Sequence, residues 1–353
     1  MKKFLTLALG VLLILAIGQS ITNAQNQTEN QPKIPQNAEK GDPIAQFQRG
    51  YAHYHGQGVS LDKMEAAKWY RLAAEGGLAE AQFNLAVMFD KGDGLTKNLS
   101  EAIVWYLKAA EQGLVEAQYN LAVTYEQLDS ARIQSEPLKD ASKNRLAAIK
   151  WHRQAAEQGS AKAQYSLGLI YFKGQGASNN KTEAIKLFRL AANQGYLKAQ
   201  FQLGKIYFKG DGVPQDKRQA VNWYRLAAKQ GSPDAQFNLG VMYDTGDGVK
   251  KNKKQAASWY RLAADQGIAQ AQFNLGVMYD HGEGVAKNQM IAMSWYQKAA
   301  EQGLADAQYN LGVIYDHGDG VAKNKKEAIK WYLLAADQGH VDAKNNLGLT
   351  NNK

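Results

Sequence analysis

The chain has 353 residues, of which 45% are hydrophobic, and it carries a formal net charge of +9. That hydrophobic fraction is ordinary for a folded protein, so the composition excludes a chain that is disordered throughout. Cysteine is absent from the sequence. This excludes disulfides, thiolate metal sites, cysteine nucleophiles and the attachment of a lipid to cysteine.

The N-terminus has the pattern of a secretory signal. Lys2 and Lys3 precede an apolar run over residues 4–18, and the segment ends with small residues up to Ala24. The run is shorter than the roughly 20 residues that cross a bilayer. We therefore expect a signal peptide over residues 1–24, a periplasmic or secreted protein, and no transmembrane segment after cleavage. The alternative is a protein anchored to the inner membrane by an uncleaved signal.

Residues 25–41 are rich in Gln and Asn, contain Pro32 and Pro35, and have few apolar side chains. Such a segment buries too little apolar surface to offset the entropy lost on ordering. The composition predicts a disordered linker.

A helical pattern then repeats eight times. Each repeat opens with an Ala-Gln pair, and the step between pairs is 36 residues except for one step of 46. The pairs begin at Ala45, Ala81, Ala117, Ala163, Ala199, Ala235, Ala271 and Ala307. In the sixth repeat, Ala235, Leu239 and Met242 form one apolar helical stripe, and Ala256 and Tyr260 form another. The period predicts an all-α solenoid of helical hairpins over residues 42–342, followed by a truncated ninth helix and tail over residues 343–353.

Glycine and tryptophan recur at fixed places in the repeat. Seven repeats have a Gly-x-Gly between the two helices, and a glycine such as Gly267 follows each second helix, as turns and left-handed helix ends require. The position of Gly240 holds only Gly or Ala, which predicts a close approach of two helix backbones. Tryptophan occupies one position in seven repeats, and we expect it to pack each second helix against its neighbours: Trp69, Trp105, Trp151, Trp223, Trp259, Trp295 and Trp331.

The sixth repeat reads Ala-Gln-Phe-Asn-Leu-Gly-Val-Met-Tyr-Asp over residues 235–244 and Ala-Ala-Ser-Trp-Tyr-Arg-Leu-Ala-Ala-Asp-Gln-Gly over residues 256–267. These units resemble Sel1-like repeats, a branch of the tetratricopeptide-type repeats. The resemblance implies a right-handed α/α superhelix and a non-catalytic scaffold that binds protein partners. The third repeat departs from the pattern, because it lacks the Gly-x-Gly and has a longer segment over residues 127–145. We expect this segment to protrude and to offer a specific contact.

The resemblance also implies that the first helices line a concave surface. The candidate partner-binding residues are therefore an aromatic row and a more variable row along these helices: Phe83, Asp90, Tyr119, Glu126, Phe172, Phe208, Phe237, Asp244, Phe273, Asp280, Tyr309 and Asp316. Such a groove would be acidic toward both ends and apolar in the centre, and it would suit an extended or helical peptide. The alternative is that the aromatic row only packs adjacent first helices.

Catalytic motifs are weak. Ser60-x-x-Lys63 and Ser178-x-x-Lys181 match the first motif of penicillin-recognising enzymes, but both lie between predicted helices and the accompanying motifs are absent. Some cysteine-rich Sel1-repeat relatives bind or hydrolyse β-lactams. A β-lactam-binding or hydrolysing envelope enzyme is therefore the alternative to a scaffold.

No metal or cofactor is predicted, because His53 and His55 lack a third ligand at a suitable spacing. The lysine clusters at residues 250–254 and 323–326 are interpreted as solvated loops, with contact to anionic lipid or envelope polymer as the alternative. No motif indicates nucleic-acid binding. We expect a monomer with a protein or peptide partner.

Overall fold

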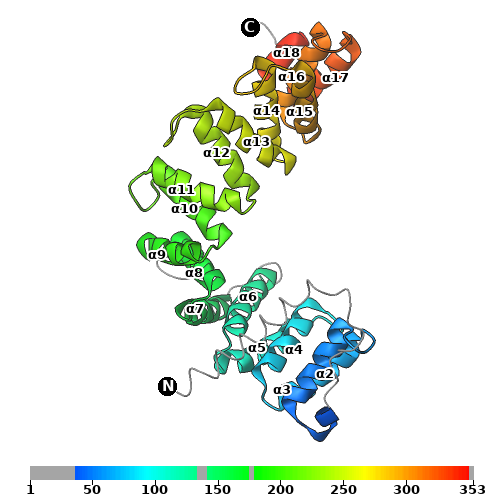
Figure 1. Ribbon diagram of the computed structural model, residues 1–353, viewed down its shortest axis with the longest axis vertical. Coiled ribbons are helices and arrows are strands. Elements are labelled where there is room, and N and C mark those ends of the chain that lie inside the picture. The colour runs from blue at the N-terminus through cyan, green and yellow to red at the C-terminus, as the bar shows by residue number, and fades with distance from the viewer. Residues whose placement is uncertain (1–35, 133–140, 175–178, 350–353) are drawn as a thin grey trace, which may run out of the picture. The chain divides into compact units, whose positions relative to one another are not determined.

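The computed structural model describes residues 36–132, 141–174 and 179–349, and every regular element within these ranges is helical (Figure 1). The predicted signal at residues 1–24, the first part of the predicted linker and residues 350–353 lie outside the described residues. Within the described ranges, no helix combines the length and the hydropathy needed to cross a bilayer.

The chain divides after Gln134 into two compact units. Unit 1 contains η2 (Gln36–Lys40), α2 (Pro43–His55), α3 (Lys63–Glu75), α4 (Ala79–Lys91), α5 (Leu99–Glu111) and α6 (Val115–Arg132). Unit 2 contains α7 (Ala141–Glu157), α8 (Ala161–Lys173), α9 (Lys181–Asn193), α10 (Leu197–Lys209), α11 (Lys217–Lys229), α12 (Pro233–Thr245), α13 (Lys253–Asp265), α14 (Ala269–His281), α15 (Gln289–Glu301), α16 (Ala305–His317), α17 (Lys325–Asp337) and α18 (Val341–Asn346). Even-numbered helices from α2 to α16 are the first helices of their repeats, and odd-numbered helices from α3 to α17 are the second helices.

Local sequence determines where each helix begins and ends. In the sixth repeat, Ser232 caps α12 by accepting a hydrogen bond from the backbone N–H of Ala235, and Pro233 occupies the first turn, where no N–H is needed. Gly246 ends the helix with a φ of 90°, in the left-handed region that favours glycine. Asn252 then caps α13 by accepting from the N–H of Gln255. The predicted hairpin is confirmed.

The position that holds only Gly or Ala faces an aromatic ring. A Cβ at Gly240 would lie 2.4 Å from Cδ1 of Tyr260, which belongs to the second helix of the same repeat and is almost fully buried. At Gly50, the ring of Tyr70 is again the nearest neighbour, and a backbone carbonyl of α3 follows at 3.2 Å. The sequence predicted a close approach of two helix backbones. In the structure, the nearest group to the small residue is a tyrosine ring, and the backbone of the second helix lies farther away.

Tryptophan joins successive repeats, as the sequence predicts. Trp295 of α15 is 6% exposed and belongs to the buried cluster formed by α13 of the preceding repeat and α14 of its own repeat. Trp331 of α17 likewise belongs to the cluster built on α15 and α16. Each of these large side chains stabilises a contact between repeats, at about 1.5–3 kcal/mol for a fully buried group.

Short elements cover the two ends of the array. Gln36–Lys40, the last part of the segment predicted as linker, forms the 3-10 helix η2. Ala38 is 1% exposed and accepts a hydrogen bond from the side chain of Gln46, while Glu39 forms an ion pair with Arg49. These contacts order a segment whose composition alone favours disorder. At the other end, the truncated ninth unit forms α18, where Ala343 is fully buried.

The longer segment of the third repeat consists largely of extended helices. Helix α6 has 18 residues and α7 has 17, whereas the first and second helices of the other repeats have 13. The first part of the segment 127–145 therefore belongs to α6 and its last part to α7. Residues 133–140 lie outside the described residues, so the expected protrusion stays a prediction.

Candidate functional site

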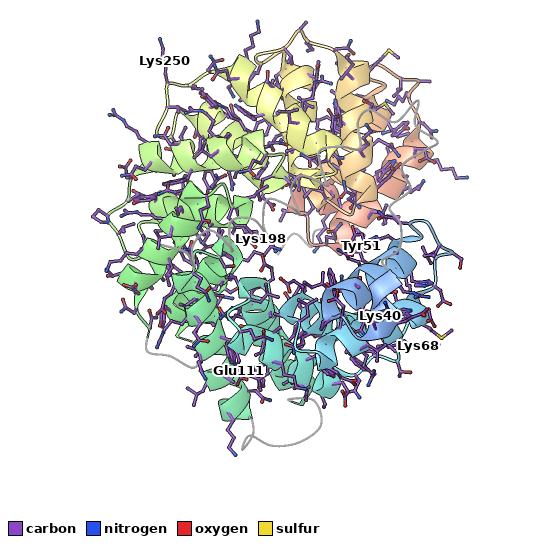
Figure 2. The ribbon with its side chains drawn as sticks, turned by 60° about the horizontal axis from the view of Figure 1, so that its bottom comes forward. Lys40, Tyr51, Lys68, Glu111, Lys198 and Lys250 are labelled. Atoms are coloured by element: carbon purple, nitrogen blue, oxygen red, sulfur yellow. The ribbon has the colours of Figure 1, made fainter. Side chains whose placement is uncertain are left out.

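Each first helix presents one stripe to solvent. On α10 this stripe contains Lys198, Phe201, Lys205 and Phe208, at the spacing of a single helical face. We call these positions, and their equivalents on the other first helices, the inner face. Figure 2 shows Lys198 on the inner side of the curve that the helices of unit 2 follow, whereas Lys250 lies at its outer edge. All twelve sequence-predicted site residues lie on this face, and all are half-buried.

The aromatic row packs against the second helix of its own repeat. The ring centroids of Phe237 and Tyr260 lie 6.0 Å apart, and those of Phe273 and Tyr296 lie 5.7 Å apart. Phe83 and Tyr309 make the same contact with Tyr106 and Tyr332. One side of each of these rings therefore belongs to the packing of the hairpin, and the half-exposed remainder is what a partner could touch. The sequence-based alternative, packing between adjacent first helices, stays open, since Phe237 also packs against the buried cluster of α13 and α14.

Carboxylates of the variable row bind lysines of the protein itself. Asp244 forms an ion pair with Lys253, the first residue of α13, and Asp316 forms the same pair with Lys325 of α17. Hydrogen bonding to Lys325 lowers the pKa of Asp316, and hydrogen bonding to Asp244 raises the pKa of Lys253. These two acids are therefore partly neutralised at the positions where the sequence predicts acidic patches.

In the middle of the row, aromatic rings replace the acids and meet the same lysines. Lys181 lies 5.5 Å from the ring centroid of Phe172, and Lys217 lies 5.7 Å from that of Phe208. A cation over an aromatic face is attracted by the negative charge of the π system. The first lysine of the second helix thus has a partner whether the row offers a carboxylate or a ring.

For two acids of the variable row, the second helix of the same repeat does not begin with a lysine. The second helices α5 and α15 begin with Leu99 and Gln289 instead. Asp90 accepts a hydrogen bond from the Tyr106 hydroxyl at 3.5 Å. Burial and, secondly, the charge of Asp280 raise the pKa of Tyr296. Asp90 and Asp280 therefore lack the helix-starting lysine that pairs with Asp244 and Asp316. The remaining predicted site residues, Tyr119 and Glu126, lie half-buried on α6.

Sequence reasoning missed a second role of these lysines. Lys217 also lies 2.7 Å from Asp247, the residue inside the Gly-x-Gly of the next repeat, and Lys253 lies 2.7 Å from Glu283 in the same way. The pairs of Lys63 with Asp93 and of Lys181 with Asp211 are equivalent. The signal was present in the sequence, since an acid inside a Gly-x-Gly follows a lysine by 30 residues in each case.

Sequence reasoning also missed the chemistry of the Ala-Gln pair. Gln236 is 4% exposed, and its side-chain N–H donates to the carbonyl of Ala228 in the preceding repeat. Its oxygen accepts from Gln266, which follows α13. Two hydrogen bonds thus join α11, α12 and the end of α13. We call this repeated arrangement the glutamine ladder; its other complete steps start at Gln82, Gln164, Gln200, Gln272 and Gln308.

The Ser-x-x-Lys lysines are engaged elsewhere. Lys63 and Lys181, predicted to lie in loops, are the first residues of α3 and α9, and each binds a carboxylate of the next repeat. Ser60 is exposed, and Ser178 lies outside the described residues. Among the residues that the structure describes, no three His, Cys, Asp or Glu side chains gather as metal ligands would.

The comparisons with known proteins agree on one family. The model of the Sel1 repeat matches eight consecutive segments, 43–78, 79–114, 115–160, 161–196, 197–232, 233–268, 269–304 and 305–340. The chain is similar to the crystal structure of a protective antigen present in uropathogenic Escherichia coli strains that displays an SLR fold, with 37% identity, a TM-score of 0.82, and coverage of 91% of this chain and 67% of that one. A Sel1 repeat protein from Oxalobacter formigenes has 32% identity and a TM-score of 0.64, over 88% of this chain and 87% of that one. Curated protein sequences gave no match.

Proposed function

Because the chain belongs to the Sel1 repeat family, we propose that it is a non-catalytic scaffold that binds protein partners on the inner faces of its first helices. Solenoids use regular, extended surfaces of this kind for binding. The observation that supports the proposal most is that the inner face is half-exposed and yet held in place. Its aromatic rings rest on buried tyrosines, while the glutamine ladder and the lysine pairs join successive repeats.

This rigidity bears on affinity. Ordering a flexible surface costs free energy when a partner binds, and a surface that is already ordered avoids that cost. Within unit 2, the inner face offers a ring, an aliphatic side chain and a polar or aromatic end in most repeats, as Phe237, Val241 and Asp244 illustrate on α12, whereas α10 has Lys205 at the aliphatic position. A peptide lying along these helices would meet an aromatic ring at the same place in every repeat.

The proposal is tested by affinity purification from envelope extract with three forms of the protein. The first is unchanged, the second carries Asp234→Trp and Gln270→Trp, which add bulk to the inner face, and the third carries Leu226→Trp and Leu262→Trp on the exposed side of second helices. The proposal predicts that the second form loses a protein that the first and third retain. Loss from the third form alone would place binding on the second helices and contradict it.

We also propose that the protein acts in the periplasm or outside the cell, on the basis of the signal pattern in residues 1–24. Cell fractionation of the full chain and of a chain without these residues tests this. The full chain should leave the cytoplasm and the shortened chain should stay there. If the full chain stays with washed membranes, the signal is an anchor.

A further inference from the structure

The charge of the inner face of unit 2 changes sign between α10 and α12. Helices α8 and α10 contain lysines and no acidic residue. In contrast, α12 and α16 each contain two aspartates, and α14 contains one. The reversal is visible at one position, the second residue of the first helix. There, exposed Lys162 and Lys198 are followed by exposed Asp234 and Asp306, with Gln270 between them.

A second lysine strengthens the positive part. Lys205 is exposed and is the ninth residue of α10, where the other first helices of unit 2 have Leu or Val. It lies seven residues after Lys198, which places the two side chains on one face of the helix, about 10 Å apart along its axis. Lys205 also lies 5.8 Å from the ring centroid of Phe201. Two cations and an aromatic ring therefore share this surface.

The positive charge is not cancelled locally. Lys198 has no ion-pair partner among the residues that the structure describes. The acids that end α12 and α16 on this face, Asp244 and Asp316, are replaced on α8 and α10 by Phe172 and Phe208. The surface is thus basic and aromatic over α8 and α10, and it becomes acidic toward α16.

We propose that the inner face of α8 and α10 binds an acidic segment of a partner protein in an extended or helical conformation. Carboxylates of the segment pair with Lys198 and Lys205, and its apolar side chains lie against the exposed sides of Phe201 and Phe208. The exposed aspartates at the second position of α12 and α16, Asp234 and Asp306, repel the acidic stretch, and so they fix where along unit 2 it binds. This inference rests on the proposed function and names the chemistry of the partner.

The test uses three fluorescein-labelled synthetic peptides of equal length and equal leucine and tyrosine content, in which the charged positions are all glutamate, all lysine or all serine. Anisotropy titrations with the full chain measure affinity at low and at physiological salt. The glutamate peptide should bind most tightly, and its affinity should fall as the salt concentration rises, because salt screens exposed charges over a Debye length of about 10 Å. Tighter binding of the lysine peptide, or equal binding of all three, would overturn the inference.

Paired variants locate the site. The double substitution Lys198→Glu and Lys205→Glu should lower the affinity for the glutamate peptide about tenfold, since two exposed charge contacts become repulsive. Lys250→Glu with Lys254→Glu makes the same change of charge on exposed residues away from the inner face and should leave binding within about twofold, as expected for distant sites. Circular dichroism and thermal unfolding confirm that both forms fold. Equal effects of the two pairs would show attraction by net charge alone and contradict the site.

Two outcomes separate this inference from the proposed function. If the inner-face variants Asp234→Trp and Gln270→Trp lose the captured partner while the substitutions at Lys198 and Lys205 leave binding of the glutamate peptide unchanged, the scaffold proposal stands and the acidic segment is rejected. Vesicles of phosphatidylglycerol provide the other comparison. Binding of these vesicles through Lys198 and Lys205, without binding of the glutamate peptide, would assign the surface to lipid and overturn the inference.

Discussion

The side chain of Gln266 donates a hydrogen bond of 2.7 Å to Oε1 of Gln236, and Gln236 in turn donates to the carbonyl of Ala228. A buried amide that bonds at both ends is costly to remove, because its partners lose hydrogen bonds that water does not replace. The arrangement recurs through the array, so the Ala-Gln pair that marks each repeat in the sequence is a structural contact between helices. It holds the first helix, and with it the inner face, against the preceding repeat.

Replacing Gln236 with Ala should therefore destabilise the protein by about 1–3 kcal/mol, since the carbonyl of Ala228 and the amide of Gln266 lose a partner. The measurement is the urea midpoint of unfolding followed by circular dichroism. Gln255→Ala on the exposed side of α13 is the matched control and should change stability by no more than about 0.5 kcal/mol. Equal midpoints for the two variants would show that the ladder contributes nothing.

Gly240→Ala should also destabilise the protein, by about 1–3 kcal/mol, because the added Cβ would overlap the ring of Tyr260. The same substitution made in a Tyr260→Leu background should cost less, since the ring that it strikes has gone. A double-mutant cycle of unfolding free energies measures this coupling. Additive effects would mean that the helix backbone, and not the ring, excludes a larger residue.

The carboxyl of Asp93 should titrate at a lower pH than an ordinary aspartate. Its hydrogen bonds from Lys63 and, secondly, from Tyr54 lower its pKa below the ordinary value of an aspartate. The stability that this pair contributes is present above the unfolded pKa of about 3.9 and is lost as the pH falls through the folded value. Side-chain carbon NMR of the folded protein measures the midpoint.

In Lys63→Met the same carboxyl should titrate at a higher pH, because its main partner is gone. Lys68→Met provides the control, since Lys68 pairs with Glu65 and not with Asp93. A midpoint for Asp93 that both variants leave unchanged would contradict the assigned pairing.

Gln289→Lys should stabilise the seventh repeat. It supplies the first lysine of α15 that the neighbouring second helices possess, within reach of Asp280 and Asp319 by analogy with Lys253. Because such pairs are exposed, the gain should not exceed about 1 kcal/mol and should shrink in high salt. Thermal unfolding at two salt concentrations checks this, with Gln255→Lys as the control. A gain that does not depend on salt would point to another cause.

The sequence predicted the hairpins well because the repeat period, the helix caps and the apolar stripes are local signals. Ser232 and Pro233 begin α12 and Gly246 ends it through such local signals. The partners of polar side chains were harder to predict, since they depend on which residues of neighbouring helices meet. Nothing in the local sequence of Gln236 indicates that it bonds to Ala228 and Gln266, and only its regular spacing from them could have suggested it.

The sequence predicted which residues share one face of the first helices but not what they contact, and partner binding on that face stays a prediction. Phe237 and Asp244 lie on the inner face as expected, but the ring packs on Tyr260 and the carboxylate binds Lys253. The ordering of residues 36–40 also escaped prediction, because it depends on the contacts of Ala38 with the first helix and not on composition.

The central claim is that partners bind on the inner face. Its most direct test places a photo-crosslinking amino acid in living cells at four positions of unit 2, one at a time: Asp234 and Gln270 on the inner face, and Leu226 and Leu262 on second helices. The two inner positions should crosslink to the same protein, and the two leucine positions should not. Crosslinks from the leucine positions, with none from Asp234 or Gln270, would contradict it.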